Sequence, residues 1–481
     1  MMGSSSSQAL LLDAVSVDNV ALTESNLTWT RAGASDQLPR SQVLFILESQ
    51  NKKPGFVICC LGEDPENRDK PFHLSLLKAT SLPTEAAQQY VIRELPPYLQ
   101  HGPSNQVHVI VSTKSGTGLA VRVWDHVLQP LWELVASHLG VQENDGHYQL
   151  TITQSSRTIR DFSKNLWASA ANGAQQTVVL LSGDGGVVDL LNGSEQDPTH
   201  ETRSLVALLP LGTGNALFHS MHKPLYSGIG PTPLVHGLRT LFQGAPARLP
   251  VFRASFSPGS RIVTFTDKAN RPSQTDGEAN LVKEETSVSH LNGAIVASYG
   301  FHASIVYESD TPEHRIHGDK RFGMVAAELL KESHPYAAQV SIRRPGSSEF
   351  EAVPRDTHAY VLATLVSNLE RTFTISPASK PLQGHLRLVH FGPVGGERTM
   401  SVMMKAYDAG KHIGMEWDDG EKVGYDQVDE VRVVVQEDDE RWRKVCIDGT
   451  IVEIPNGGQM SVRMLERGPL RILVDPQALA Q

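Results

Sequence analysis

Short apolar runs separated by polar turns characterise the first part of the chain. Ser41–Glu48 and Gly55–Leu61 are rich in β-branched and apolar residues, and the turn signal Gln50–Pro54 lies between them. Thr84 opens a short helical pattern. We therefore predict a small β-rich extension over residues 21–100 that one helix closes.

After this extension, apolar runs alternate with segments of helical periodicity. The runs are Val107–Val111, Tyr148–Thr153, Thr177–Leu181 and Ser204–Leu209, and the helical segments are Leu119–Leu139, Ile159–Ala171 and a segment that ends at Asn192. This alternation predicts a parallel sheet with right-handed crossovers, and uniformly apolar strands fit a sheet that is covered on both faces. We assign residues 104–235 to a doubly wound parallel α/β domain.

From residue 236 onward, strand patterns dominate. The predicted strands are Phe252–Phe256, Arg261–Phe265, Gly293–Tyr299, Ala338–Ile342, His358–Val366, Leu386–Val389, Val431–Val435, Trp442–Ile447, Met460–Met464 and Leu470–Val474, with one helix at Arg321–Lys331. We predict a mainly antiparallel β-sandwich domain over residues 236–478. Residues 267–289 are polar and lack an apolar period, which predicts a disordered insertion.

Composition and charge narrow the class of protein. The 481 residues include 43 basic and 53 acidic ones, a net charge of −10 that disfavours a dedicated nucleic-acid binder. The three cysteines, Cys59, Cys60 and Cys446, cannot build a disulfide framework or a cysteine zinc site, and they favour a reducing compartment. Every apolar run is far shorter than the ~18 residues of a membrane span.

Residues 1–20 are expected to form a disordered tail without a secretory signal. Met2-Gly3 followed by four serines also fits an N-myristoylation signal if translation begins at Met2. We favour the serine-rich tail as the simpler interpretation, and the sequence leaves the modification of Gly3 open.

Three glycine-rich loops follow strands of the predicted parallel sheet. They are Ser112-Thr113-Lys114-Ser115-Gly116-Thr117-Gly118, Ser182-Gly183-Asp184-Gly185-Gly186 and Pro210-Leu211-Gly212-Thr213-Gly214-Asn215-Ala216. In doubly wound folds, ligands bind beyond the carboxyl ends of the strands, where such loops meet. Backbone N–H groups in these loops can hold a phosphate, although the first loop lacks the spacing of a Walker A motif.

The second loop places a carboxylate, Asp184, between glycines that leave it without steric cover. We expect this side chain to be exposed at the edge of the sheet, where it could bind Mg²⁺ or accept a hydroxyl proton. The alternative is an ordinary Asp-Gly turn. Three glycine-rich loops on one sheet favour a functional site over three unrelated turns.

The loops resemble those of the catalytic domain of diacylglycerol and sphingoid-base kinases. The resemblance rests on Ser182-Gly183-Asp184-Gly185 followed by Leu191-Asn192-Gly193, on Pro210–Leu217, on Gly116, Gly118 and Ala120, on Tyr299-Gly300-Phe301, on Arg315, Gly318, Arg321 and Phe322, and on Cys446-Ile447-Asp448-Gly449. It covers about Val107 to Val474, and the preceding β-rich stretch is similar to the extension of fungal and plant sphingoid-base kinases. NAD kinases share the Gly-Asp-Gly loop but lack the Gly-Thr-Gly-Asn-Ala-Leu signature, so we rank them lower.

This resemblance implies an ATP-dependent lipid kinase that phosphorylates the primary hydroxyl of a sphingoid base, a ceramide or a diacylglycerol-like lipid. Asp184 would be the catalytic proton acceptor, with ATP and Mg²⁺ over the three loops. The implied nucleotide-binding residues are Ser112, Lys114, Ser115, Gly116, Thr117, Gly118, Ser182, Gly183, Gly185, Gly186, Asp189, Gly212, Thr213, Gly214, Asn215, Arg315, Arg321, Asp448 and Thr450.

The same resemblance implies how the acceptor is bound and where the protein acts. The lipid would enter the β domain, where Ser304 and Val306 occupy the acceptor-binding positions. The two arginines would hold ATP phosphates through guanidinium hydrogen bonds. We expect a cytoplasmic protein with peripheral contact to intracellular membranes or the plasma membrane, and no nucleic-acid partner.

Several positions depart from the family pattern. Ser112-Thr113 replaces Asn-Pro, Gly186 replaces a larger residue and is expected to loosen its loop, and Asp189 replaces a glutamate. Thr450 stands where the family motif Asp-Gly-Glu has its glutamate, a carboxylate on the nucleotide or metal side. A catalytically weakened pseudokinase that acts as a lipid-binding or scaffold protein therefore stays open as an alternative.

One further departure concerns the substrate. Sphingosine kinases place an acidic residue shortly after the Gly-Phe pair, where it binds the amine of the substrate. The aligned residue is Val306, and Glu308 is near but not aligned. An apolar residue fits a neutral acyl lipid, such as ceramide or diacylglycerol, at least as well as an amine.

Overall fold

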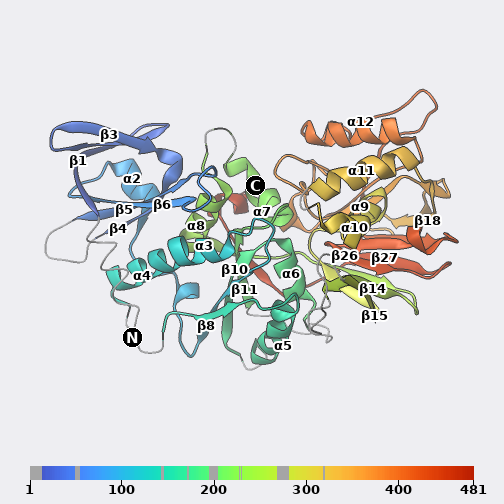
Figure 1. The fold of residues 1–481 in the computed structure, drawn as a ribbon, viewed down its shortest axis with the longest axis horizontal. Helices are drawn as coiled ribbons and strands as arrows, with labels where there is room; N and C mark the ends of the chain where they lie inside the picture. The colour runs from blue at the N-terminus through green and yellow to red at the C-terminus, as the bar shows by residue number, and fades with distance from the viewer. Residues whose placement is uncertain are drawn as a thin grey trace, which may run out of the picture. The chain divides into compact units, whose positions relative to one another are not determined.

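The structure is a computed structural model that describes residues 14–48, 55–141, 146–170, 173–193, 204–226, 228, 230–267, 281–317 and 320–480. The chain divides into two compact units (Figure 1). Unit 1 comprises Met1–Phe218, His222–Arg248 and Pro469–Gln481, and unit 2 comprises His219–Met221 and Leu249–Gly468. Unit 1 contains a mainly parallel sheet with helices, whereas unit 2 is built mainly from antiparallel strands.

Unit 1 begins with the β-rich extension. Its strands form one sheet in the order β3-β2-β1-β6-β5-β4-β7. The elements are β1 (Val15–Leu22), β2 (Asn26–Arg31), β3 (Ala34–Pro39), β4 (Val43–Glu48), β5 (Phe56–Glu63), β6 (Phe72–Ala79), α2 (Thr84–Tyr90) and β7 (Val91–Ile92). The predicted tail is wrong for residues 15–20, which belong to β1. The predicted turn at 50–54 and Gly3 lie outside the described residues.

The strand β4 connects the extension to the α/β part, because its two faces pack into two different hydrophobic cores. Leu44, Phe45 and Leu47 belong to the core that also contains the helices of the α/β part, whereas Val43 and Ile46 face a second core within the extension. A strand that is covered on both faces has no polar positions, which accounts for the apolar run in the sequence. The extension therefore shares a hydrophobic core with the α/β part.

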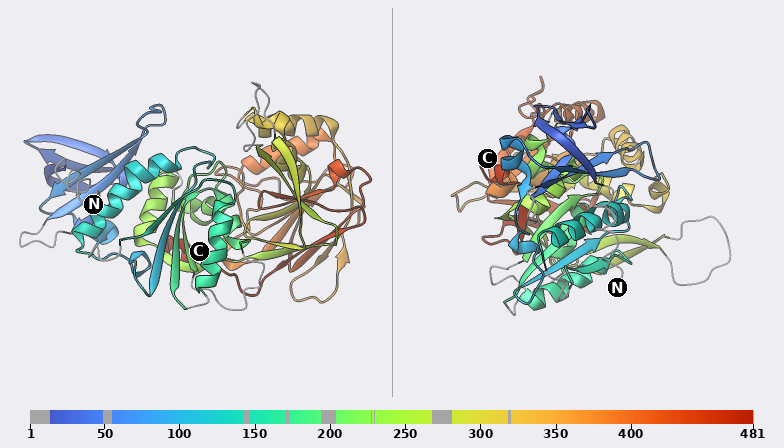
Figure 2. Two further views of the ribbon diagram at one scale, coloured as in Figure 1. Left: turned by 60° about the horizontal axis from the view of Figure 1, so that its bottom comes forward. Right: turned by 90° about the vertical axis from the view of Figure 1, so that its left-hand side faces the viewer.

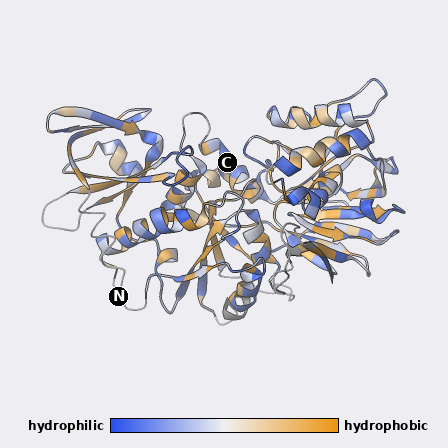
Figure 3. Cartoon of the chain, viewed as in Figure 1, coloured by the Kyte–Doolittle hydropathy of each residue, from blue (hydrophilic) through white to orange (hydrophobic). Residues whose placement is uncertain are grey.

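The central sheet of unit 1 has the order β12-β28-β11-β10-β8-β9. All its strands are parallel except β12, which pairs antiparallel with β28. Its strands are β8 (Asn105–Val111), β9 (Gln149–Ile152), β10 (Gln175–Ser182), β11 (Ser204–Pro210), β12 (Ala245–Arg248) and β28 (Arg471–Val474). Figure 3 shows the apolar character of the central strands.

Two expectations about the domain boundary are corrected by this sheet. The strand at Leu470–Val474, which we assigned to the β domain, is β28 and pairs with β11 in unit 1. Ile472 and Val474 are fully buried there, because the returning strand lies between β11 and β12. The expected boundary between residues 235 and 236 falls inside a helix, α8 (Pro233–Gln243).

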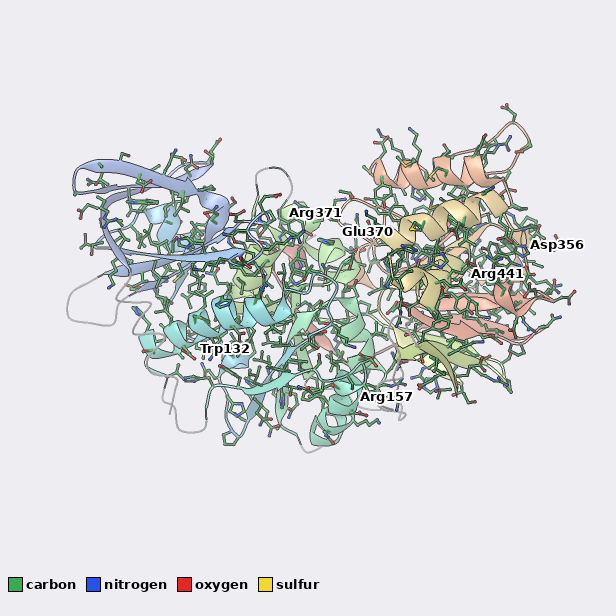
Figure 4. All side chains as sticks on the ribbon, in the orientation of Figure 1. Trp132, Arg157, Asp356, Glu370, Arg371 and Arg441 are labelled. Atoms are coloured by element: carbon green, nitrogen blue, oxygen red, sulfur yellow. The ribbon has the colours of Figure 1, made fainter. Side chains whose placement is uncertain are left out.

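The other helices of unit 1 are α3 (Ala120–Val123), α4 (Gln129–His138), α5 (Thr158–Ala170), α6 (Asp184–Leu191) and α7 (Ala216–His222). The predicted single helix at Leu119–Leu139 contains a π-helical turn at Trp124–Leu128. Pro130 follows this turn and has no N–H to donate, so a wider turn accommodates it. Trp132, labelled in Figure 4, is buried on α4, 5.3 Å from the ring of Tyr148.

Unit 2 contains two antiparallel sheets. Their orders are β16-β13-β27-β24-β18-β19, with β20 on β18, and β15-β14-β26-β25-β17-β21-β22-β23. The strands are β13 (Phe252–Phe256), β14 (Arg261–Asp267), β15 (Leu281–Ser287), β16 (His290–Gly293), β17 (Val296–Gly300), β18 (Tyr336–Arg343), β19 (Glu351–Ala352), β20 (Thr357–His358), β21 (Tyr360–Thr364), β22 (Leu386–Phe391), β23 (Gly424–Val428), β24 (Glu430–Val435), β25 (Lys444–Ile447), β26 (Thr450–Glu453) and β27 (Gln459–Met464). The antiparallel character of this part is confirmed (Figure 2).

The helices of unit 2 are α9 (Phe301–Ser309), α10 (Pro312–Arg315), α11 (Arg321–Glu332) and α12 (Gly396–Tyr407). The predicted insertion at 267–289 is wrong for residues 281–287, because β15 pairs with β14 along its full length. It is an edge strand whose Lys283 and Glu285 form an ion pair at 2.7 Å, so its sequence is polar. Residues 268–280 lie outside the described part. No helix in the described ranges is long and apolar enough to cross a membrane.

Candidate functional site

The three glycine-rich loops leave the central sheet of unit 1 at neighbouring strand ends. From β8, the chain moves to β9 on one side of the sheet and later to β10 on the other side, so the strand order reverses between β8 and β10. Such a switch point is where doubly wound sheets bind ligands. Ser112 N donates to Leu181 O at 3.0 Å and Leu211 N donates to Ser182 O at 3.1 Å, so the loops start side by side.

The second and third loops approach each other through glycine backbones. A Cβ atom on Gly183 would lie 2.8 Å from Cα of Gly212, and a Cβ atom on Gly212 would lie 2.5 Å from Cα of Gly183. A Cβ atom on Gly116 would similarly lie 2.0 Å from Oγ1 of Thr213. Only glycine fits at these close approaches, which bring backbone from three loops together.

Hydrogen bonds then fix the first loop to the third. Ser115 Oγ and Thr117 Oγ1 both donate to Leu211 O, at 2.7 and 2.8 Å. Within the third loop, Asn215 Oδ1 accepts from Gly212 N at 2.9 Å and Asn215 Nδ2 donates to Gly212 O at 2.7 Å. The side chains of the predicted site residues Ser115, Thr117 and Asn215 therefore shape the loops.

Asp184 is not exposed as the sequence suggested. Its side chain is half-buried, and Oδ2 accepts from Ala216 N at 2.7 Å while Oδ1 accepts from Leu217 N at 3.1 Å. Burial raises the pKa of Asp184 to about 6, and the two backbone donors oppose that shift. The carboxylate is thus oriented by the first turn of α7, and each oxygen keeps lone pairs for a proton or a cation.

The two glycines after Asp184 differ in their surroundings. A Cβ atom on Gly185 would meet nothing within 4 Å, whereas one on Gly186 would lie 2.8 Å from Leu180 Cδ2 and 3.0 Å from Ser182 Oγ. Gly186 is buried, so the expectation that it loosens the loop is wrong: it lets α6 pack closely on the end of β10.

The remaining predicted residues of unit 1 lie around these loops. Ser182 is buried at the end of β10, Lys114 and Thr213 are exposed, and Ser112 and Gly214 are half-buried. Gly118 has a φ of 66°, in the left-handed region that favours glycine. Asp189 lies on α6, and burial raises its pKa to about 6 while Arg160 opposes the shift. The helix α6 thus carries two carboxyl groups with raised pKa values.

The two arginines that the resemblance assigns to phosphate lie in unit 2 and converge on Asp310. Arg315 Nε and Nη2 donate to the two carboxylate oxygens of Asp310 at 3.1 and 2.7 Å, and its Nη1 donates to Phe265 O at 3.0 Å. Nη2 of Arg321 lies 3.8 Å from Oδ1 of Asp310. The sequence reasoning did not identify Asp310.

Asp448 and Gly449 form the two-residue turn of the hairpin between β25 and β26. Their φ values are 46° and 88°, as expected for an Asp-Gly hairpin turn. The Asp448 carboxylate accepts from the backbone N–H groups of Ala294, Ile295 and Val296, at distances down to 2.6 Å. Asp448 therefore holds a backbone turn of unit 2, and Thr450, its neighbour in the motif, pairs with Ile447 as the first residue of β26.

The predicted lipid-binding residues lie on α9. Ser304 is buried near the side chain of Tyr336. Val306 packs against an apolar cluster of Val263, Ala303, Cys446 and Ile451. Neither residue carries a charge toward an amine.

An apolar surface that the sequence reasoning missed lies on α12. Met400, Met404 and Tyr407 are 42%, 58% and 47% exposed. Their spacing of four and three residues places them on one side of the helix. The ring of Phe373 lies 4.8 Å from that of Tyr407 and extends this apolar stripe. The signal in the sequence was the helical spacing of two methionines and an aromatic residue between Gly396 and Tyr407.

Among the described residues, no group of three or more His, Cys, Asp or Glu side chains could hold a metal ion. Mg²⁺ in nucleotide sites is held by one or two carboxylates together with substrate phosphates. Asp184 fits that donor set, because both of its oxygens keep acceptor capacity.

Comparison with known proteins bears on the segment that carries the loops. Residues 106–248 match the model of the diacylglycerol kinase catalytic domain family. None of the curated proteins matches the chain. A solved structure of a diacylglycerol kinase from Bacillus anthracis str. Sterne has 13% identity, covers 78% of this chain and 98% of its own, and gives a TM-score of 0.45.

A second structure from the same strain, of a "putative diacylglycerol kinase", has 13% identity, covers 79% of this chain and 98% of its own, and gives a TM-score of 0.49. The family match includes all three glycine-rich loops and ends at Arg248, where unit 1 gives way to unit 2.

Proposed function

We propose that the protein is an ATP-dependent lipid kinase that transfers the γ-phosphate of ATP to the primary hydroxyl of a lipid. One observation carries the proposal: the segment that matches the diacylglycerol kinase catalytic domain brings three glycine-rich loops together at the switch point of a parallel sheet, beside an oriented carboxylate. Phosphoryl transfer depends mainly on positioning and charge stabilisation, which such a site can supply.

The loops of unit 1 bind the nucleotide in this proposal. Backbone from Gly116, Gly183 and Gly212 approaches closely because none of the three residues has a side chain. Bound ATP brings Mg²⁺, which neutralises phosphate charge, and Asp184 is the carboxylate suited to contact that ion or the acceptor. Arg315 and Arg321 remain the proposed phosphate-binding cations, for which the carboxylate of Asp310 is the present partner.

Asp184 is the proposed proton acceptor. With a pKa of about 6, its carboxylate is mostly ionised at neutral pH and yet basic enough to take a proton from an alcohol as the oxygen attacks phosphorus. The N–H groups of Ala216 and Leu217 fix the direction of both oxygens. The proposed proton acceptor is therefore already oriented before the lipid binds.

For the acceptor, we favour a neutral acyl lipid such as diacylglycerol or ceramide over a sphingoid base. Val306 faces an apolar cluster, and the Glu308 carboxylate is paired with Arg441 Nε at 2.7 Å. The stripe of Met400, Met404 and Tyr407 on α12 is an apolar surface to which an acyl chain can bind. Action on a lipid would place the protein in the cytoplasm with peripheral membrane contact.

A pseudokinase that binds lipid without phosphorylating it is the second candidate. Thr450 favours it, because this position lacks the carboxylate that the family motif has, and the neighbouring Asp448 is committed to three backbone N–H groups. Such a protein would retain the loops and the apolar surface. It would show no turnover.

A radiolabel assay with purified protein, Mg-ATP and a panel of diacylglycerol, ceramide, sphingosine and sphinganine separates the candidates. Asp184→Asn and Gly185→Asp should abolish phosphorylation while the protein stays folded, since a side chain at Gly185 meets open space. Asp161→Asn is the matched control, because Asp161 is an exposed carboxylate that forms a local ion pair with Lys164 at 2.9 Å. Equal activity of wild type and Asp184→Asn would exclude the kinase proposal.

A further inference from the structure

The helix α8 lies between the β-rich extension and the central sheet. It packs on β11 on one side and on β4 of the extension on the other. Leu238 and Phe242 of α8 belong to the same core as Phe45 of β4, and the Phe45 and Phe242 rings are 4.9 Å apart. The helix α8 is therefore one of the elements that connect the extension to the sheet.

Polar anchors from the extension hold α8 at both ends. At the N-terminus, the Thr232 hydroxyl accepts from Val235 N at 3.2 Å and donates to the Glu63 carboxylate. At the C-terminus, the Tyr98 hydroxyl donates to Leu241 O, and Gly244 O lies 3.3 Å from the same oxygen. These contacts oppose both rotation and sliding of the helix.

A third anchor, Arg239, lies between them. Its Nε donates to Val43 O at 2.7 Å, and Nη2 lies 3.1 Å from Arg40 O and 3.3 Å from Ser41 O. The guanidinium also lies over the Tyr90 ring, 5.3 Å from its centroid. Burial lowers the pKa of Arg239 from its ordinary value. The rigid guanidinium of arginine places donors on separate atoms, Nε and Nη2, toward these carbonyls, and the single nitrogen of a lysine does not reproduce that spacing.

On its other side, α8 lies directly against the end of β11. A Cβ atom on Gly237 would lie 3.0 Å from Cδ of Pro210 and 3.2 Å from Cδ2 of Leu209. Pro210 opens the third glycine-rich loop, and the next residue, Leu211, accepts hydrogen bonds from the first loop. Because Gly237 has no side chain that could adjust, a displacement of α8 would be transmitted to Pro210 and the loop that follows it.

We propose that the β-rich extension is a clamp that sets the position of α8 and, through it, of the loop Pro210–Asn215, with Arg239 as the central positioning residue. The extension lies outside the segment that matches the kinase domain, which begins at residue 106. The link from the extension through α8 to this loop is inferred from the packing and hydrogen bonds described above, and it does not depend on the proposed function. Its consequence, that nucleotide affinity depends on the extension, rests on the proposed function.

Hydrogen exchange of the full chain tests the link without any use of activity. Arg239→Lys keeps the charge but loses carbonyl contacts, and Tyr98→Phe removes a single hydroxyl. Arg93→Lys is the matched control, since Arg93 is in the extension but pairs with Glu48 on the surface. In both clamp variants, we expect the amides of residues 211–217 to exchange about tenfold faster, because local opening becomes easier. Arg93→Lys should leave them unchanged.

Binding of a non-hydrolysable ATP analogue with Mg²⁺ provides the second measurement. Both clamp variants should bind it several-fold to about tenfold more weakly at unchanged circular dichroism, because loop misplacement weakens binding. Faster exchange confined to α8 and the extension, with residues 211–217 still protected, would overturn the clamp. Failure of the wild type to bind the analogue would instead count against the proposed function and leave the exchange result standing. If Arg239→Lys does not fold, Tyr98→Phe still decides the matter.

Discussion

Arg441, which is labelled in Figure 4, has its Nε 2.7 Å from Oε1 of Glu308, and its guanidinium also reaches Glu332 at 3.1 Å. Glu308 is the carboxylate on α9 nearest in sequence to the position where sphingosine kinases bind the amine of their substrate. Because the Glu308 side chain is 11% exposed and already paired with a cation, it offers no free charge to a second one. This pairing is the structural basis for favouring a neutral lipid.

A substitution at Val306 tests the acceptor preference. Val306 packs against Val263, Ala303, Cys446 and Ile451, so Val306→Asp would place a carboxylate on an apolar cluster. We expect a loss of stability of about 1–3 kcal/mol and no gain of activity toward sphingoid bases. Thermal unfolding and the lipid panel measure the two effects. A stable Val306→Asp variant that prefers sphinganine would show that this side chain faces the acceptor after all.

Substitutions at two loop glycines should distinguish an effect on the packing of the loops from an effect on ligand binding. Gly212→Ala directs a methyl group at Cα of Gly183, 2.5 Å away, and should cost about 1–3 kcal/mol of stability together with most of the activity. Gly185→Ala meets open space and should be as stable as the wild type. Thermal unfolding of the two variants, followed by nucleotide binding, makes the comparison. Equal stability of both would contradict the close approach of the loops.

The Gly-Asp-Gly and Gly-Thr-Gly-Asn patterns predicted the loops and their place on the sheet, because strand, glycine turn and helix are local features. What the sequence could not reveal depends on contacts between distant segments. The partner of Asp184 is the backbone of residues 216 and 217, so the side chain is oriented rather than open. Likewise, the apolar run Leu470–Val474 reads as a strand, but only its pairing with β11 shows which sheet it joins.

The sequence also does not show what polar side chains contact, and this affected the predictions for β15 and Asp448. The strand β15 carries Lys283 and Glu285, which pair with each other along the edge strand, so the segment lacks the apolar period that marks a strand. The family resemblance assigns Asp448 to the nucleotide site, which stays a prediction; in the structure, its backbone has the left-handed φ of a hairpin turn and its oxygens accept from three amides. The motif therefore predicts an aspartate at position 448, but only the structure shows that its carboxylate accepts from backbone N–H groups.

Asp448 should consequently behave as a structural residue. Asp448→Ala leaves the N–H groups of Ala294, Ile295 and Val296 without their acceptor, which should destabilise unit 2 by about 2–4 kcal/mol. Asp448→Asn keeps one carbonyl oxygen and should lose less. Denaturant unfolding compares the two variants with the wild type. If Asp448→Ala unfolds like the wild type but fails to bind nucleotide, the residue has the ligand role that the family motif implies.

The pH dependence of Asp184 supplies the last prediction. Its pKa in the folded protein, about 6, lies above the ordinary value of 3.8, so the folded state binds more protons than the unfolded state between these two values. The contribution of Asp184 to the free energy of unfolding is therefore fully present below pH ~4, and it is lost as pH rises through about 6. Asp184→Asn does not titrate, so its stability relative to the wild type should increase over the same interval.

Activity should change in the opposite direction with pH. If the ionised carboxylate accepts the proton of the lipid hydroxyl, kcat/KM falls about tenfold per pH unit below pH ~6. Urea unfolding at pH 4.5, 6 and 7.5 and initial rates over the same range provide the two measurements, with Asp161→Asn as the control carboxylate. A stability difference between wild type and Asp184→Asn that stays constant with pH would mean that Asp184 does not titrate near 6. A flat rate profile beside a titrating stability difference would place proton acceptance on another group.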